Sequence, residues 1–165
     1  MIHLNDGKQI MTESWEYNEY GIYNYNETPD GLDVINSVNL KHKNLFELPF
    51  RFHIVYGDFD CSHNHLTSLR GSPKIIHGKF TFLVNNIQDL DHFPKFIGGD
   101  VQIDTAPWIT AKELQKVLFS EIHGEIHVIN HFFDTIQPWT SILNKYKNKK
   151  SMIPQAIKEL RESIK

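Results

Sequence analysis

The apolar residues of this chain recur with a period of 21 residues. One unit carries Phe59, Cys61, Asn64, Leu66, Leu69, Pro73 and Gly78. The unit after it carries Phe80, Phe82, Asn85, Ile87, Leu90, Pro94 and Gly99, and the unit before it carries Val38, Leu40, Lys43, Leu45, Leu48, Phe52 and Gly57. A fixed period of this length is typical of a solenoid, in which each unit buries its apolar side by stacking on its neighbours. We therefore predict a binding surface rather than a catalytic pocket.

Each unit is predicted to be a short strand followed by a return segment. The alternation in Phe59-x-Cys61 indicates a strand with one buried face. Asn64 follows at a fixed offset, where its amide can satisfy backbone groups at the turn, as an asparagine ladder does. The spacing Leu66-x-x-Leu69 points two more residues into the core, and Gly78 precedes the next strand, where a tight or left-handed turn would favour glycine. Parallel strands are expected at 38–40, 59–61, 80–82, 101–103 and 126–128.

The pattern changes at both ends of the array. Residues 21–26 and 31–35 flank the turn sequence Glu27-Thr-Pro-Asp30 and predict a hairpin. After a break at 106–108, Thr110-Ala-Lys-Glu113 is a candidate capping box that starts a helix in the last repeat. Further helices are predicted from apolar spacing and from Pro154 at a first turn. Their apolar positions are Phe132, Phe133, Ile136, Trp139, Ile142, Leu143 and Tyr146, then Ala156, Ile157, Leu160 and Ile164.

Together these elements predict an α/β solenoid with a parallel sheet of about five strands. Residues 1–36 form an N-terminal cap with the hairpin, and 37–104 hold the 21-residue repeats. Residues 105–130 form a last repeat with a true helix, and 131–165 form a C-terminal helical cap. The simplest interpretation is that the final helices cover the last strand, and the alternative is that one of them docks a partner.

The middle unit, GDFDCSHNHLTSLRGSPKIIHGKF, resembles the leucine-rich repeats of small proteins from tailed bacteriophages and some bacteria. The resemblance covers about residues 36–104, with Lys43 in place of the asparagine in the first unit. It implies a short leucine-rich-repeat fold. It also implies a phage-encoded protein that binds a host bacterial protein and modulates it. The more specific expectation is that binding inhibits the host protein.

Composition limits the class of protein. The chain has 165 residues, 40% of them hydrophobic and 22% charged, which excludes a disordered acidic chain. The sequence lacks an apolar run long enough to span a membrane and a basic, apolar leader at its N-terminus, and Cys61 is its single cysteine. These features predict a cytoplasmic protein, in the host cell if it is viral.

Charge is distributed unevenly along the chain. Residues 141–165 hold seven basic and two acidic residues, a balance of 7 − 2 = +5, whereas the whole chain carries −3. The preceding part therefore carries −3 − 5 = −8. Such a division favours surfaces with different partners, although a solvated terminal helix would give the same pattern.

The candidate binding site lies on the outward face of the predicted strands. If Phe59 and Cys61 point inward, the residues between and beside them point to the open face. Stacking the repeats gives three columns: Ser37, Asp58, Lys79, Asp100 and Glu125; Asn39, Asp60, Thr81, Gln102 and His127; Lys41, Ser62, Leu83, Asp104 and Ile129. The predicted face is concave and acidic, with Leu83 and Ile129 as apolar contacts, and it suits a protein with a basic patch. The alternative is a solvated sheet with no partner.

Signals for chemistry are weak. His123 and His127 are four apart on a predicted strand, which spans about 13 Å, so they cannot chelate one ion together. Cys61 occupies an inward position and is expected to be an inert thiol. We predict no catalytic residue, cofactor or metal site, with a metal-dependent enzyme on the sheet face as the weaker alternative. The basic segment Lys145–Lys150 leaves nucleic-acid binding as a second alternative, although the acidic body would repel phosphates.

Overall fold

The computed structural model describes residues 3–5, 8–10, 12–104, 109–130, 135–136 and 138–163. Its strands are β1 (His3–Asn5), β2 (Lys8–Ile10), β3 (Tyr25–Thr28), β4 (Gly31–Val34), β5 (Val38–Asn39), β6 (Phe52–Val55), β7 (Phe59–Asp60), β8 (Ile75–Ile76), β9 (Phe80–Thr81), β10 (Phe96–Ile97), β11 (Val101–Asp104), β12 (Glu121–Ile122), β13 (Ile126–Asn130) and β14 (Thr135–Ile136). The helices are α1 (Thr12–Glu19), α2 (Ala111–Leu114), α3 (Trp139–Tyr146) and α4 (Ile153–Glu162), with 3-10 helices η1 (Gln115–Phe119) and η2 (Lys150–Met152).

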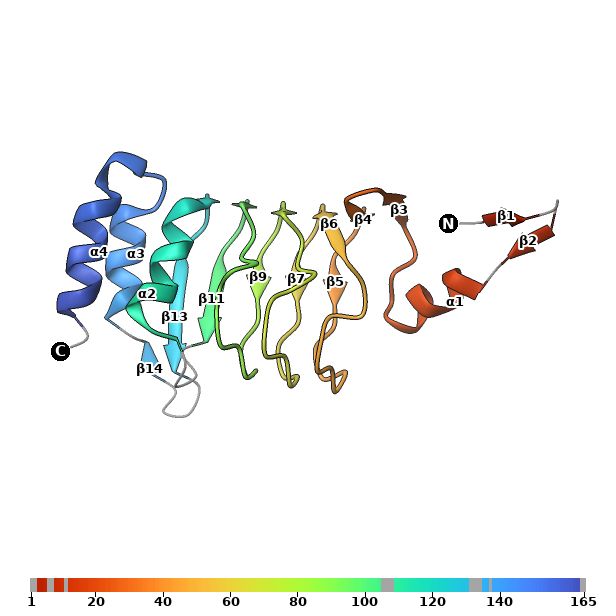
Figure 1. The fold of residues 1–165 in the computed structure, drawn as a ribbon, viewed down its shortest axis with the longest axis horizontal. Coiled ribbons are helices and arrows are strands. Elements are labelled where there is room, and N and C mark those ends of the chain that lie inside the picture. The colour runs from red at the N-terminus through yellow and green to blue at the C-terminus, as the bar shows by residue number, and fades with distance from the viewer. Residues whose placement is uncertain are drawn as a thin grey trace.

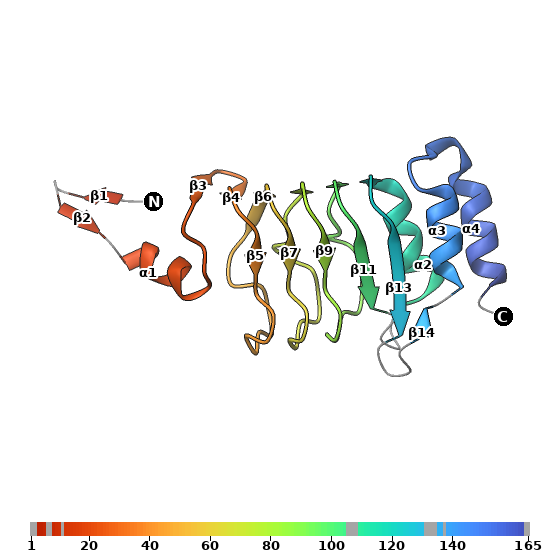
Figure 2. The same cartoon turned by 180° about the vertical axis from the view of Figure 1, so that it is seen from behind.

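The chain folds as a β-solenoid of about four turns, in which parallel sheets stack coil upon coil. Figure 1 shows the coils side by side along the long axis, with α2, α3 and α4 at the C-terminal end. The reverse view in Figure 2 shows the same order, with α1 at the opposite end.

Each complete coil contributes one strand to each of two sheets. Sheet 1 has the order β14-β13-β11-β9-β7-β5, and all its pairs are parallel except β13 with β14. This confirms the five parallel strands expected from the repeat. Sheet 2 has the order β12-β10-β8-β6-β4-β3, and only the β3–β4 pair is antiparallel. The sequence did not predict sheet 2 as a second sheet, because its central strands place two apolar residues side by side, as in Ile75-Ile76 and Phe96-Ile97, and so show no apolar–polar alternation.

The core lies between the two sheets and the return segments. Each strand residue pairs with the residue at the equivalent position of the next repeat, so like residues stack. Phe59 lies beside Phe80, and Phe80 lies beside Val101. Leu66, Leu69 and Leu90 of the return segments are fully buried as expected, whereas Leu45 of the first repeat is only partly buried. The column from sheet 2 that faces them is also buried, and it consists of Val34, Val55, Ile76, Ile97 and Ile122.

The predicted asparagine ladder is present at two coils. Asn64 accepts hydrogen bonds from the backbone N–H groups of Lys43 and Leu45, and its amide donates to the carbonyl of Leu40 at 2.8 Å. Asn85 accepts from the Leu66 N–H at 3.0 Å and repeats the same pattern one coil further on. Both side chains are buried. The ladder thus satisfies backbone groups of the turn that no strand can pair.

The glycines before each sheet 1 strand are required by close stacking and not by a left-handed backbone. Gly57, Gly78 and Gly99 are absent from the positive-φ residues. They form their own ladder, in which Gly78 N–H donates to the Gly57 carbonyl and Gly99 N–H to the Gly78 carbonyl, at 3.0 and 2.9 Å. A Cβ on Gly78 would lie 2.7 Å from the Gly57 carbonyl carbon, which real Cβ atoms do not approach. Successive coils touch backbone to backbone at this corner.

At the N-terminal end, the expected hairpin is formed by β3 and β4, with Thr28 opposite Gly31. Strand β4 also pairs with β6, in parallel, so the hairpin forms the N-terminal edge of sheet 2. Tyr17 of α1 packs edge-on against Tyr25 and Phe50, and its hydroxyl donates to Glu27 at 3.0 Å. These contacts hold α1 against the first coil.

The last repeat differs in part from expectation. A helix does follow Thr110, but it is one α-turn (α2) continued by η1, and Thr110 makes no side-chain capping bond. The capping-box prediction is wrong because Glu113 is used elsewhere: its carboxylate accepts the Leu90 N–H at 2.9 Å and pairs with Lys116 at 2.7 Å. Burial raises the pKa of Glu113, but these two hydrogen bonds outweigh it and hold the pKa below its ordinary value.

Among the described residues of the final segment, the first helix begins at Trp139. Ile136 lies in β14, antiparallel to β13, so its assignment to a helix is wrong. The predicted positions Phe132, Phe133 and Ile164, and the break at 106–108, lie outside the described residues. Pro138 is the residue before α3, and Pro154 stands in the first turn of α4 as expected. Apolar residues of both helices are buried, namely Leu143, Tyr146, Ala156 and Leu160.

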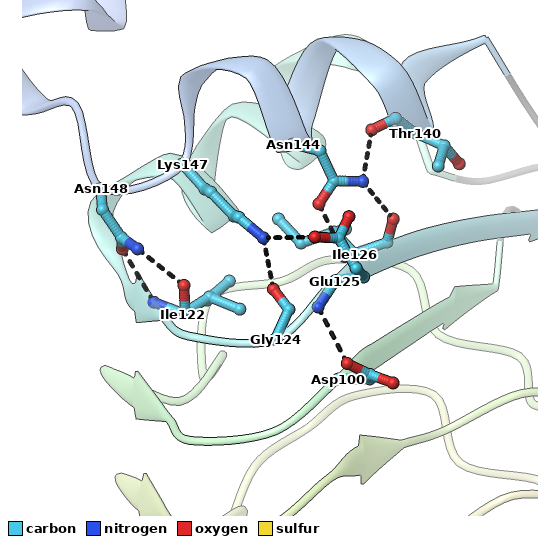
Figure 3. A network of polar contacts seen from close by, with 9 residues as sticks. All are labelled: Asp100, Ile122, Gly124, Glu125, Ile126, Thr140, Asn144, Lys147 and Asn148. Carbon is cyan, nitrogen blue, oxygen red and sulfur yellow. Dashed lines mark hydrogen bonds and ion pairs between the residues drawn. The ribbon is translucent and has the colours of Figure 1, made fainter.

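Two side chains of α3, Thr140 and Asn144, and Asn148 in the turn after it bond to the last coil, and Figure 3 shows the bonds of the two asparagines. Asn144 accepts the Ile126 N–H at 2.8 Å and donates to the Ile126 carbonyl at 2.7 Å. Asn148 makes the same pair of bonds with Ile122 of β12, and Thr140 does so with Val128. These side chains take the backbone groups that a further coil would otherwise pair.

Candidate binding surfaces

The middle column of the predicted site is formed as expected. The register of sheet 1 places Asn39 beside Asp60, Asp60 beside Thr81, and so on through Gln102 to His127. Asn39 is exposed and the other four are partly exposed. Asp60 also accepts the Ser62 N–H at 2.9 Å, a local turn bond that leaves its charge on the face.

The first column contains acids with a structural role. Asp58 accepts the Lys79 N–H at 2.7 Å, and Asp100 accepts the Glu125 N–H at 2.9 Å. Each carboxylate therefore bonds to the next coil while remaining on the surface. Glu125 is partly neutralised, because Lys147, the residue that follows α3, approaches it at 3.2 Å (Figure 3).

The third column is not an open row. Ser62 and Asp104 are each only 2% exposed, so their assignment to the outward face is wrong. Asp104 instead accepts the Val84 N–H at 2.8 Å, and Ser62 accepts the Leu83 N–H at 3.1 Å. Both side chains serve the turn that leaves the strand. Lys41 is exposed, while Leu83 and Ile129 are half-buried.

Sheet 2 carries an apolar outer face that the sequence analysis missed. Ile54, Ile75 and Phe96 are paired neighbours in adjacent strands, and each is only partly buried. The column begins at Asp33 and ends at Glu121. The 21-residue spacing of the three apolar residues was visible in the sequence, but the same spacing also marks core positions.

An aromatic row runs along the edge of this face. Tyr56 stacks on His77 with ring centroids 5.1 Å apart and planes 12° apart. His77 contacts Phe96 at 5.7 Å, and Phe96 contacts His123 at 5.1 Å. Tyr56 is 49% exposed, and Ile35, its equivalent one coil earlier, is 48% exposed.

This row borders the acidic column across the glycine corner. Tyr56 and Asp58 flank Gly57, and His77 and Lys79 flank Gly78. We call the surface formed by Ile35, Tyr56, His77, Asp58, Asp60, Lys79 and Asp100 the corner surface. It joins an exposed apolar and aromatic row to three acids, with Lys79 between Asp58 and Asp100, and neither sheet face offers this combination alone.

Reactive chemistry is weak in the described part of the chain. Cys61 is completely buried, and this burial raises the pKa of its thiol well above the ordinary value. No group of three or more His, Cys, Asp or Glu side chains among the described residues is placed to hold a metal ion. His123 and His127 do not converge, since His123 bonds to Glu121 at 2.7 Å while His127 lies beside Gln102.

The basic C-terminal segment is largely engaged within the chain. Lys145 pairs with Glu159 at 3.1 Å, Lys147 donates to the Gly124 carbonyl and Lys149 to the Lys145 carbonyl. Hydrogen bonds from Tyr146 and then Lys145 lower the pKa of Glu159. This weakens the argument for a phosphate-binding cluster at 145–150.

Comparison with known protein families, curated proteins and solved structures finds no match to this chain. Among the described residues, no helix has the length and apolar character needed to cross a membrane.

Proposed function

We propose that this chain is a non-enzymatic protein-binding solenoid whose partner docks on the corner surface. The observation that carries the proposal is the exposed row of Ile35, Tyr56 and His77 beside Asp58 and Asp60. Exposed apolar groups rimmed by charge are typical of protein interfaces. The acids would steer a basic partner, and the apolar row would supply the central contacts.

The proposed anchors differ from those expected from the sequence. Leu83 and Ile129 belong to the column in which Ser62 and Asp104 are buried, so that column is not a continuous exposed surface. Tyr56 is a better anchor because tyrosine supplies a large, rigid contact area and its ring is already held by His77.

The two ends of the solenoid support lateral binding. An open sheet edge is a template for pairing with another chain. We propose that α3 acts as the C-terminal cap, because Thr140, Asn144 and Asn148 occupy the edges of β12 and β13. The β3–β4 hairpin with α1 would serve as the N-terminal cap. With both ends occupied, the sides of the stack remain for a partner.

The resemblance of residues 36–104 to leucine-rich repeats of phage proteins supports a narrower proposal. The partner would then be a protein of a bacterial host, and binding would modulate or inhibit it. Its surface should carry a basic patch that complements Asp58, Asp60 and Asp100.

Affinity capture from a bacterial lysate with matched variants tests the proposal. Replacing the three acids by asparagine (D58N, D60N, D100N) removes charge but keeps the Oδ1 acceptors used by the backbone. This is cleaner than charge reversal, which would also break those bonds. Tyr56→Ser tests the apolar anchor. Asp30→Asn and Glu162→Gln are controls, since both residues are exposed and lie outside the corner surface.

The expected result is one protein held in fixed ratio by the wild type and the controls. It should be lost with Tyr56→Ser. The triple variant should retain less of it than the wild type does, and this difference should be largest at low salt, where the attraction to the wild-type acids is least screened. Retention of that protein by both corner variants would refute the docking site. Recovery of nucleic acid without a stoichiometric protein would favour the nucleic-acid alternative. Turnover that depends on a sheet-face acid would favour an enzyme.

A further inference from the structure

A second surface lies where the return segments meet sheet 2, away from the glycine corner. Here the loops of three successive coils, residues 46–52, 67–74 and 91–95, enclose a groove of about 980 Å³. The groove crosses the coils, so a ligand lying in it would run along the stack. Each coil adds one strand spacing, about 4.8 Å, to the length of the groove.

Four cationic side chains line the groove: Arg51, Arg70, Lys74 and Lys95. All four are exposed, and within the described residues none of them has an ion pair. Lys74 and Lys95 occupy the same position in adjacent coils and repel each other. An anion bound between them would relieve that repulsion.

The acids of the groove do not cancel this charge. Among the described residues, Glu47 and Asp91 are the carboxylates that line it, which leaves a balance of 4 − 2 = +2. Asp91 is already paired with Lys116, and the hydrogen bond from Lys116 lowers the pKa of Asp91. A chain with a net charge of −3 therefore carries a cationic groove on one side.

The groove also has apolar walls and one unsatisfied hydroxyl. Phe50 and Phe93 line it as half-buried rings, and Phe46 stands at 69% exposure, stacked on His65 at 5.0 Å. Ser72, another lining residue, is 8% exposed, and its Oγ finds no hydrogen-bond partner among the described residues. A buried hydroxyl without a partner is costly, so a ligand oxygen that reached it and accepted its hydrogen bond would be favoured.

We propose that this groove binds an acidic peptide segment of a partner protein, with carboxylates on the four cations and an apolar residue against the phenylalanines. A peptide fits better than a nucleic acid because Glu47 and the net negative charge of the chain oppose a continuous line of phosphates. A peptide can place its carboxylates intermittently, between apolar residues. This surface would act in addition to the corner surface and has the opposite charge preference.

Fluorescence anisotropy with the full chain tests the proposal. The probe is a labelled eight-residue peptide of alternating Glu and Leu, compared with the same peptide carrying Gln in place of Glu and with an eight-nucleotide oligothymidylate. The variant is K74Q with K95Q. The matched control is K112Q with K158Q, two exposed lysines outside the groove.

The acidic peptide should bind the wild type and the control equally, and the groove variant at least about tenfold more weakly. The Gln peptide should not bind. Binding should weaken as salt rises, because the contacts are screened. Equal loss of affinity in the groove variant and the control would overturn the proposal, as would no binding of the acidic peptide. Tighter binding of the oligothymidylate would assign the groove to single-stranded nucleic acid instead.

Discussion

Replacing Asn85 by alanine should destabilise the solenoid strongly, whereas the same change at its neighbour Asn86 should not. Asn85 is 4% exposed and lies inside the turn, while Asn86 is exposed. The two positions share residue type and sequence neighbourhood. They therefore separate the contribution of the ladder from any general effect of losing an asparagine.

The size of the effect follows from the hydrogen bonds of the Asn85 amide. Its oxygen accepts the Leu66 N–H at 3.0 Å, and its nitrogen lies 3.0 Å from the Cys61 carbonyl and 3.2 Å from that of Phe82. The amide nitrogen has two hydrogens, so three bonds are made at full strength. At about 1 kcal/mol each, the loss is about 3 kcal/mol, with more from the buried backbone groups left unpaired.

Urea unfolding followed by circular dichroism measures this difference. Asn85→Ala should lower the free energy of unfolding by about 3 kcal/mol, and Asn86→Ala should change it by less than about 0.5 kcal/mol. The backbone bond from Asn86 N–H to the Leu66 carbonyl is retained in both variants. Equal effects of the two substitutions would refute the view that the side-chain ladder stabilises the turns.

Two further predictions concern the stacking of coils and the acid response. Gly78→Ala should lower the free energy of unfolding by about 1–3 kcal/mol, measured by urea unfolding, because the new Cβ would press on Gly57 and Asp58; an unchanged midpoint would contradict close stacking at this corner. Glu113, whose pKa is held below its ordinary 4.5, contributes stability in full above pH 4.5 and loses it as pH falls through the lowered value. Unfolding measured across this range should therefore show a shallower acid loss for Glu113→Gln than for the wild type, and parallel curves would refute the contribution.

The fold could be predicted where the sequence repeats and not where it changes. The sequence repeat identified the five parallel strands of sheet 1 and both rungs of the ladder, because those positions recur with like residues, but it did not identify the antiparallel strand β14. Sheet 2 was not predicted because strands such as Ile75–Ile76 consist of two apolar residues in a row and show no alternation. The capping box failed because a carboxylate at Glu113 can bond to a distant backbone group as well as to its own helix.

The candidate surfaces show the same limit. Period-two alternation placed Asp60 and Thr81 correctly, since both lie within regular strands. Asp104 stands at the end of β11, where the backbone turns and draws the side chain inward to Val84. The corner surface and the cationic groove each combine residues from several coils. Their chemistry could be read from the sequence, but their proximity depended on sheet 2.

The bonds from α3 have a consequence for how such a chain could change length. Asn144 and Asn148 recognise the main chain of Ile126 and Ile122, and main-chain groups are the same in every coil. Duplication or deletion of one whole 21-residue unit would therefore preserve the register of both sheets. The bonds from Asn144 and Asn148 to the last coil would also be preserved. Each added unit would extend the corner surface and the groove by about 4.8 Å. The number of repeats thus sets the length of both surfaces, and unequal recombination could change that number without changing the fold.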